Sequence, residues 1–200
     1  MTLNVSTVFL FSFIAYLLGS IPTAFIVVKL IRKKDIREIG SGNVGATNTY
    51  RAAGLFWAIF VFLIDMAKGF LPSWYICHTF VNGPFIYIPV IFLLIGHIYS
   101  IFLKFSGGKG AATGLGIFFA LAPVATIFML GIWVLTMFVF KIVSLSSIIA
   151  AASLPLTYFF LVGIDNTFYF TFICSLLVIV MHKNNIKRLL SGQEKALTSK

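Results

Sequence analysis

A glycine-rich segment with the composition of an anion-binding loop runs from Gly40 to Arg51, with the sequence Gly-Ser-Gly-Asn-Val-Gly-Ala-Thr-Asn-Thr-Tyr-Arg. Glycines let successive backbone N–H groups turn toward one anion, and Ser, Thr and Asn side chains add donors. The segment contains G-x-G-x-x-G, but a dinucleotide site needs that motif between a strand and a helix of a parallel sheet. An apolar run precedes it here, so we reject that interpretation. The alternative to anion binding in this first glycine segment is a flexible turn between helices.

A second glycine segment, residues 106–114, has the sequence Ser-Gly-Gly-Lys-Gly-Ala-Ala-Thr-Gly and leads into an apolar run. We expect a helix to begin there, so that free N–H groups and a positive dipole end lie beside Lys109, an arrangement that suits phosphate. The spacing of a Walker A motif is absent. The alternative is close helix packing, because Gly110 and Gly114 form a G-x-x-x-G pattern.

The last apolar run ends in a third polar segment, His-Lys-Asn-Asn-Ile-Lys-Arg-Leu-Leu at residues 182–190. His182 and Asn185 are three residues apart and share a helix face, which favours a functional role for both. For the basic residues of this segment we favour an amphipathic tail at the membrane surface.

Smaller polar signals lie within or beside the apolar runs. Asp65 and Lys68 are three apart within one run. Charges inside a membrane suggest function, but a pair on one helical turn can neutralise itself, and we favour a structural role. His97 fits either a site residue or an interfacial histidine. The serines at 144, 146 and 147 fit either a helix N-cap or hydroxyl groups offered to an anion.

The composition requires a lipid environment. Hydrophobic residues make up 60% of the 200 positions and charged residues 10%, whereas soluble domains average about 25% charged residues. The net charge of +10 lies in short loops and the tail, so it indicates membrane lipids and phosphorylated substrates as partners and not nucleic acid. Cys77 and Cys174 lie in apolar runs and are expected to be free thiols.

The apolar runs predict an all-α integral membrane protein, a bundle of seven transmembrane helices in a single domain of residues 1–200. As one helix, 110–140 would be about 46 Å long at about 1.5 Å per residue, too long for a core of about 30 Å. Pro123 lies near its middle, so we expect two helices there. The expected spans are 3–31, 53–80, 84–103, 110–121, 124–140, 144–163 and 167–182, followed by a cytoplasmic tail, 183–200.

Loop charge orients this bundle with its N-terminus outside and its C-terminus in the cytoplasm. Seven helices place every loop cation on one side, whereas a six-helix alternative would place the tail outside. The cytoplasmic cations of the seven-helix arrangement are Arg32, Lys33, Lys34, Arg37, Arg51, Lys104, Lys109, Lys141, Lys183, Lys187, Arg188, Lys195 and Lys200.

Taken in order, these segments resemble the bacterial acyl-phosphate:glycerol-3-phosphate acyltransferase family. The resemblance covers residues 19 to about 194, and one departure is visible, at Lys183 and Asn184, where the family more often has Arg and Glu. The matching motifs are Gly19-Ser-Ile-Pro22, the first glycine segment, Asp65-x-x-Lys68-Gly69, Gly96-His97, Gly107-Gly-Lys-Gly-x-x-Thr-Gly114, Ser144-x-x-Ser147 and His182-x-x-Asn185-Ile-Lys-Arg-Leu-Leu.

The resemblance implies a cytoplasmic-facing site that transfers an acyl group from acyl phosphate to glycerol 3-phosphate, giving lysophosphatidate, the first step of phospholipid synthesis in a bacterial inner membrane. It also implies an enzyme that supplies acyl phosphate. The positions that match the family's substrate-binding groups are Ser41, Arg51, Lys109, Ser147, His182 and Asn185. We expect Ser41, Lys109 and His182 to be catalytic. Further substrate-binding residues are expected in the glycine segments: Gly42, Asn43, Gly45, Thr47, Asn48, Gly107, Gly108, Gly110 and Thr113.

The chemistry of an acyl phosphate favours direct attack, because the acyl carbon of a mixed anhydride is already electrophilic. No cofactor or metal is expected, since the sequence has no carboxylate cluster to hold one. A Ser-His-Asp arrangement is not apparent, so we do not expect an acyl-enzyme. The base is either His182, whose unperturbed pKa of about 6.5 suits the task, or an oxygen of the acyl phosphate. The chief rival function is an organic phosphate transporter, which predicts midplane polar groups and an inverted repeat.

Overall fold

The computed structural model describes residues 4–80 and 83–197, and all regular secondary structure in these residues is helical. Residue 3, where the first predicted span begins, the outer-loop positions 81–82 and the end of the predicted tail, 198–200, lie outside them. The chain divides into two compact units, Met1–Leu121 and Ala122–Lys200. This division falls inside the single predicted domain.

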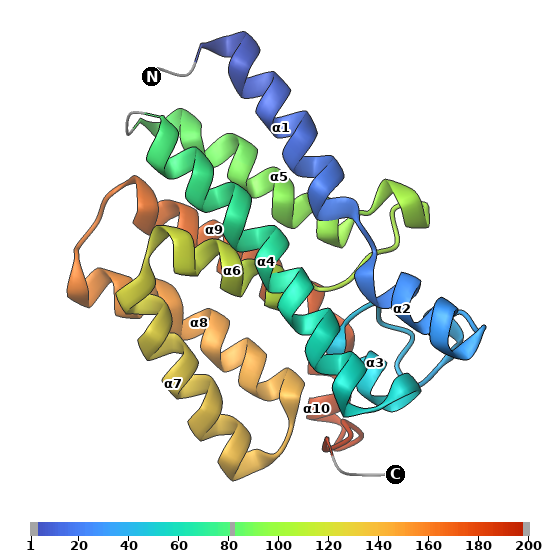
Figure 1. Ribbon diagram of the computed structural model, residues 1–200. Coiled ribbons are helices and arrows are strands. Elements are labelled where there is room, and N and C mark those ends of the chain that lie inside the picture. Colours follow the sequence, from blue (N-terminus) through green and yellow to red (C-terminus); the bar gives the residue numbers. More distant parts are fainter. Residues whose placement is uncertain (1–3, 81–82, 198–200) are drawn as a thin grey trace. The chain divides into compact units, whose positions relative to one another are not determined.

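The N-terminal unit contains six α-helices and three short 3-10 turns among its described residues (Figure 1). Helix α1 packs against α5, and α4 packs against α6, while α3 joins α2 to α4. The helices are α1 (Val5–Ser20), α2 (Thr23–Arg32), α3 (Ala46–Ala53), α4 (Leu55–Thr79), α5 (Tyr87–Ile98) and α6 (Ala111–Leu121), and the turns are η1 (Ile36–Glu38), η2 (Pro84–Ile86) and η3 (Ile101–Leu103).

The C-terminal unit contains four helices among its described residues, α7 (Pro123–Phe140), α8 (Val143–Leu161), α9 (Asn166–Met181) and α10 (Lys183–Leu190). Helix α8 packs between α7 and α9. The α9–α10 pair is bent by 59° at His182. The predicted tail therefore begins with an amphipathic helix of its own.

Five helical stretches of the described residues are long and apolar enough to cross a membrane, and there are six if the bent pair α9–α10 is one span. Large apolar side chains such as Phe9, Phe138 and Phe160 are exposed along these helices, as expected where lipid is the solvent. The five stretches are Val5–Arg32, Leu55–Thr79, Pro84–Leu103, Pro123–Phe140 and Val143–Leu161. The predicted region 110–140 is divided into two helices at Ala122. The eleven residues of α6 are short for a span, so the count of seven remains a prediction.

The helix of the first predicted span is interrupted, which the sequence interpretation missed, although Val5–Arg32 still forms one candidate span. Helix α1 ends at Ser20 and α2 begins at Thr23, with Ile21 and Pro22 between them. Proline has no N–H group, and it disfavours helical geometry in the residue before it, so Ile21 ends the first helix. Pro22 was the available signal.

A buried apolar cluster holds α2, η1, α3 and α4 together around the first glycine segment. Its side chains come from both sides of that segment, so the segment is anchored by packing before any polar contact is considered. The buried members are Ala24, Val27, Val28, Ile36, Val44, Ala52, Val61 and Leu103.

Close contact between α4 and α6 depends on the absence of side chains at Gly69 and Gly116. A Cβ at Gly116 would overlap the Met66 carbonyl, and one at Gly69 would overlap the Thr113 carbonyl. Small residues bring backbones together in this way in membrane helices. Both atoms in the way belong to the backbone, so the contact cannot relax by moving a side chain.

We predict that Gly116→Ala separates α4 from α6 and lowers the free energy of unfolding by about 1–3 kcal/mol, as overpacking typically does. Denaturant or thermal unfolding of the purified protein in detergent measures the change. The matched control is Gly131→Ala in α7, because no atom lies within 4 Å of a Cβ built at Gly131. Equal losses of stability in the two variants would contradict the prediction.

Candidate functional site

The predicted site residues are divided between the two units. The N-terminal unit contains both glycine segments, and the C-terminal unit contains Ser147, His182 and Asn185. The two sets of residues are described separately below.

The first glycine segment is organised by the side chain of Asn48, which is completely buried. Its Oδ1 accepts a hydrogen bond of 3.1 Å from the Ser41 N–H, and its Nδ2 donates to the carbonyls of Ile36 and Ile39 at 3.0 and 2.9 Å. The amide thereby links the start of the segment, the η1 turn and helix α3. Both N–H bonds of the side-chain amide are used inside the protein, so Asn48 positions the segment, and its contact with substrate stays a prediction.

The segment turns back on itself through Gly42, which has a φ of +70°. Its N–H donates to the Ile39 carbonyl at 3.0 Å, so this amide is also unavailable to an anion. Ser41 and Arg51 are exposed, and Thr47 is half-buried. The exposed side-chain donors of the segment are therefore Ser41 and Arg51, near its two ends.

The second glycine segment closes the end of α5. The N–H groups of Gly107 and Gly108 donate to the carbonyls of Ile98 and His97 at 2.9 and 3.0 Å, which lie in the last turn of α5 and have no helical donor. These two N–H groups are thus bonded within the protein, and the free N–H groups that we expect beside Lys109 belong to the helix that follows. Gly110 has a φ of +83°, a conformation that favours glycine.

The two glycine segments meet at Gly108. A Cβ there would overlap the ring of His97 and crowd the carbonyl of Val44, which belongs to the first segment. His97 also bonds Thr113, whose hydroxyl lies 3.1 Å from Nδ1. Both side chains are buried, so the contact between His97 and Thr113 joins α5 to α6.

Lys109 follows Gly108 and lies two residues before the first residue of α6. The first N–H groups of a helix have no helical acceptor, and the helix dipole is positive at that end. Lys109 is half-buried. The start of α6 therefore supplies a cation and the donors of Ala111 and Ala112 together, which suits a phosphate group.

In the C-terminal unit, His182 occupies the bend between α9 and α10. Its Nδ1 lies 2.8 Å from the Val178 carbonyl, and the side chain is buried. A carbonyl can only accept, so Nδ1 carries the hydrogen and the ring is held in one orientation. Ser147 accepts a hydrogen bond of 3.3 Å from the Trp133 indole.

Glu194 accepts hydrogen bonds from three polar side chains of the C-terminal unit, a role that the sequence interpretation missed. Its Oε1 accepts hydrogen bonds of 2.6 Å from Ser144 and from Asn185, and its Oε2 accepts one of 2.6 Å from Arg188. Ser144 therefore offers its hydroxyl to a carboxylate of this chain, and the N-cap role weighed for it is wrong. The one acid in a basic tail was the available signal.

The pKa of Glu194 reflects two opposed effects. Burial acts to raise it, but hydrogen bonds from Ser144, Arg188 and Asn185, with the charge of Arg188, lower it below the ordinary glutamate value. The ionised carboxylate therefore stabilises the folded tail above the ordinary glutamate pKa. That contribution is lost as the pH falls through the lowered value.

We predict that Glu194 titrates below an ordinary glutamate and that Arg188→Met moves its pKa upward, because this change removes a positive charge and a hydrogen bond. Carbon NMR of protein labelled at the glutamate side-chain carboxyl measures both values. The chain's other glutamate is Glu38, and Glu38→Gln identifies its signal. An unchanged titration of Glu194 in Arg188→Met would contradict the prediction.

Comparison with known proteins bears on both units. The family model described as glycerol-3-phosphate acyltransferase matches residues 9–192. A glycerol-3-phosphate acyltransferase of Endomicrobium trichonymphae is 45% identical over 190 residues, which cover 94% of each chain. One of Syntrophotalea carbinolica is 41% identical over 181 residues, which cover 90% of this chain and 92% of the relative.

Two solved structures have the same fold as this chain. Both are crystal structures of PlsY (YgiH), an integral membrane glycerol 3-phosphate acyltransferase, one in its glycerol 3-phosphate form and one in its lysophosphatidic acid form. They superpose with TM-scores of 0.91 and 0.88, at 36% identity and with 95% of each chain covered. The resemblance in the short motifs is thus confirmed over nearly the whole chain, which is an integral membrane protein and belongs to the glycerol-3-phosphate acyltransferase family.

Proposed function

We propose that this protein transfers a fatty acyl group from acyl phosphate to the 1-hydroxyl of glycerol 3-phosphate, in a bacterial inner membrane. Family membership supports the acyltransferase activity and the acceptor, since the solved relatives are a glycerol 3-phosphate form and a lysophosphatidic acid form. The acyl phosphate donor rests on the resemblance of the motifs. We also propose that the site faces the cytoplasm, with seven spans, the N-terminus outside and the tail inside, because this arrangement keeps all loop cations on one side.

The single observation that carries the proposal is the meeting of the two glycine segments beside the start of α6. Lys109 and the first N–H groups of α6 would bind the phosphate of glycerol 3-phosphate, as a point charge beside a positive helix end. Arg51 would bind a phosphate group with its two-pronged guanidinium, and Ser41 would donate a hydrogen bond beside it. Together they offset the repulsion between two anionic substrates.

The reaction in this proposal is a single displacement. The glycerol hydroxyl oxygen bonds to the acyl carbon, the bond from that carbon to the phosphate oxygen breaks, and the hydroxyl proton passes to the departing phosphate. Lysophosphatidate and inorganic phosphate are the products. Holding the two reactants side by side is worth roughly 7–11 kcal/mol of the barrier in well-oriented systems, so positioning supplies most of the catalysis.

Three residues of the C-terminal unit, Ser147, His182 and Asn185, are proposed to bind substrate on the strength of the family motifs alone. The fixed ring of His182 supports a role in orienting a phosphate group, since Nδ1 is committed to the Val178 carbonyl. An enzyme that produces acyl phosphate is the proposed partner, because a mixed anhydride hydrolyses if it is not used promptly.

We predict that the purified protein converts acyl phosphate and labelled glycerol 3-phosphate into labelled lysophosphatidate. We also predict that Lys109→Met reduces the rate at least about a hundredfold, as loss of a group that stabilises reacting charge does. The variant keeps the apolar stem of the side chain. Lys104→Met is the matched control, because Lys104 is exposed and precedes the second glycine segment.

Two outcomes would contradict this proposal. Release of phosphate without lysophosphatidate would reject acyl transfer to glycerol 3-phosphate. A Lys109→Met rate equal to that of Lys104→Met would remove Lys109 from the site.

We predict that His182→Gln lowers kcat/KM by a similar factor at every pH between 5 and 9, because His182 orients phosphate and the acyl phosphate takes the proton. The pH–rate profile of the variant, divided by that of the wild type, measures this. A loss that grows toward one end of the pH range would instead assign His182 as the general base.

A further inference from the structure

Two buried charges of the N-terminal unit have no part in the proposed reaction. Asp65 and Lys68 of α4 form an ion pair of 2.8 Å, and their side chains are only 3% and 9% exposed. Charges in an apolar span are costly unless they are paired and hydrogen-bonded. The hydrogen-bond partners of Asp65 and Lys68 therefore indicate the role of this ion pair in the structure.

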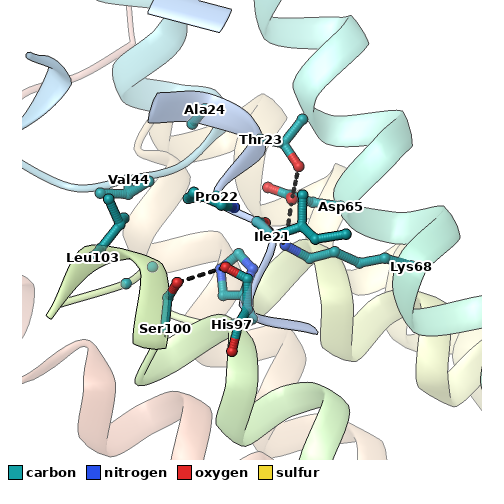
Figure 2. A pocket seen from close by; sticks show the side chains of 13 residues that line it. Ile21, Pro22, Thr23, Ala24, Val44, Asp65, Lys68, His97, Ser100 and Leu103 are labelled. Atoms are coloured by element: carbon teal, nitrogen blue, oxygen red, sulfur yellow. Dashed lines mark hydrogen bonds and ion pairs between the residues drawn. The ribbon is translucent and has the colours of Figure 1, made fainter. Parts of the chain in front are cut away.

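The partners of this ion pair are at the break between α1 and α2 (Figure 2). Lys68 Nζ donates to the Ile21 carbonyl at 2.9 Å, and the Thr23 hydroxyl donates to Asp65 Oδ1 at 2.9 Å. Ile21 and Thr23 flank Pro22, where the helical hydrogen bonds are interrupted. On the other side of the break, the Ser100 hydroxyl donates to the Ser20 carbonyl at 2.5 Å.

A small cavity of about 10 Å³ connects this break to both glycine segments. Its lining includes Asp65, Lys68 and His97, together with Val44 of the first segment and Gly107 and Gly108 of the second. A cavity of this size holds about one water molecule, which is too little for a phosphate ester. What the lining residues share is the contact between the break and the two glycine segments.

Helix α2 connects the ion pair to the first glycine segment through apolar packing. Helix α2 begins directly after the break, and Ala24, Val27 and Val28 pack in the same apolar cluster as Val44. Val44 lies against Gly108, where the two segments meet. A shift of the break relative to α4 would therefore separate the first segment from the second.

We propose that the Asp65–Lys68 pair is a positioning device, which holds the Ile21–Pro22 break against α4 and thereby keeps the two glycine segments at the distance that glycerol 3-phosphate requires. This inference rests on the proposed function. The pair touches no reacting atom, so its effect appears in the affinity for glycerol 3-phosphate.

The test is the double variant Asp65→Asn/Lys68→Met, which removes both charges together and leaves no unpaired charge. Calorimetric titration with glycerol 3-phosphate gives the Kd, and steady-state assays give KM and kcat. We expect both Kd and KM to rise at least about fivefold, a typical effect of losing a hydrogen bond that orders a binding segment. A pair that only stabilises the fold would leave both constants unchanged in the folded variant.

A second pair of variants avoids the charges altogether. Thr23→Val removes the hydroxyl bonded to Asp65 with nearly the same shape, whereas Thr23→Ser retains it. We expect a raised KM in Thr23→Val alone. This comparison decides the proposal if the double variant does not fold. Asp165→Asn is the control for loss of a charge, because Asp165 caps α9 in the other unit.

The outcomes separate the two proposals. A wild-type protein that does not acylate glycerol 3-phosphate contradicts the proposed function. An active wild type with a folded double variant whose Kd and KM stay within about twofold, or with equal KM values for Thr23→Val and Thr23→Ser, overturns the positioning role.

Discussion

An apolar helix bundle requires that every backbone carbonyl released by a helix break finds a donor within the protein, because lipid provides none. In this chain the constraint applies at Ile21 and Pro22, where α1 ends before α2 begins. The carbonyls of Ser20 and Ile21 are satisfied by a serine hydroxyl and a lysine ammonium. The ammonium is in turn neutralised by Asp65. The direction of α2, and with it the first glycine segment, depends on this arrangement.

Several glycines serve backbone hydrogen bonding and helix packing, including two that the sequence analysis assigned to substrate binding. Gly107 and Gly108 satisfy carbonyls at the end of α5, and Gly116 lets α4 and α6 touch. The side-chain amide of Asn48 likewise forms its hydrogen bonds with backbone groups. Much of the polar composition of these segments thus builds the scaffold, and the groups that we propose for anion binding are Ser41, Arg51, Lys109 and the first N–H groups of α6.

Composition and local pattern were sufficient for most of the fold. The apolar runs predicted the helices, and Pro123 together with flanking lysines predicted that 110–140 would be two helices, as α6 and α7 are. These features depend on residues close together in the chain. The interruption of the first helix was missed although Pro22 is visible in the sequence, since a continuous apolar run of sufficient length was taken as one helix.

The sequence by itself determined that this is a membrane protein of the glycerol-3-phosphate acyltransferase family, and which segments carry its polar groups. Only the tertiary structure decided which partners those groups take. Thr23 bonds a residue 42 positions away, Lys68 one 47 positions away, and Ser144 one 50 positions away. Hydrophobic periodicity and helix propensity act over a few turns, whereas such pairings depend on how helices pack, and no local pattern encodes that.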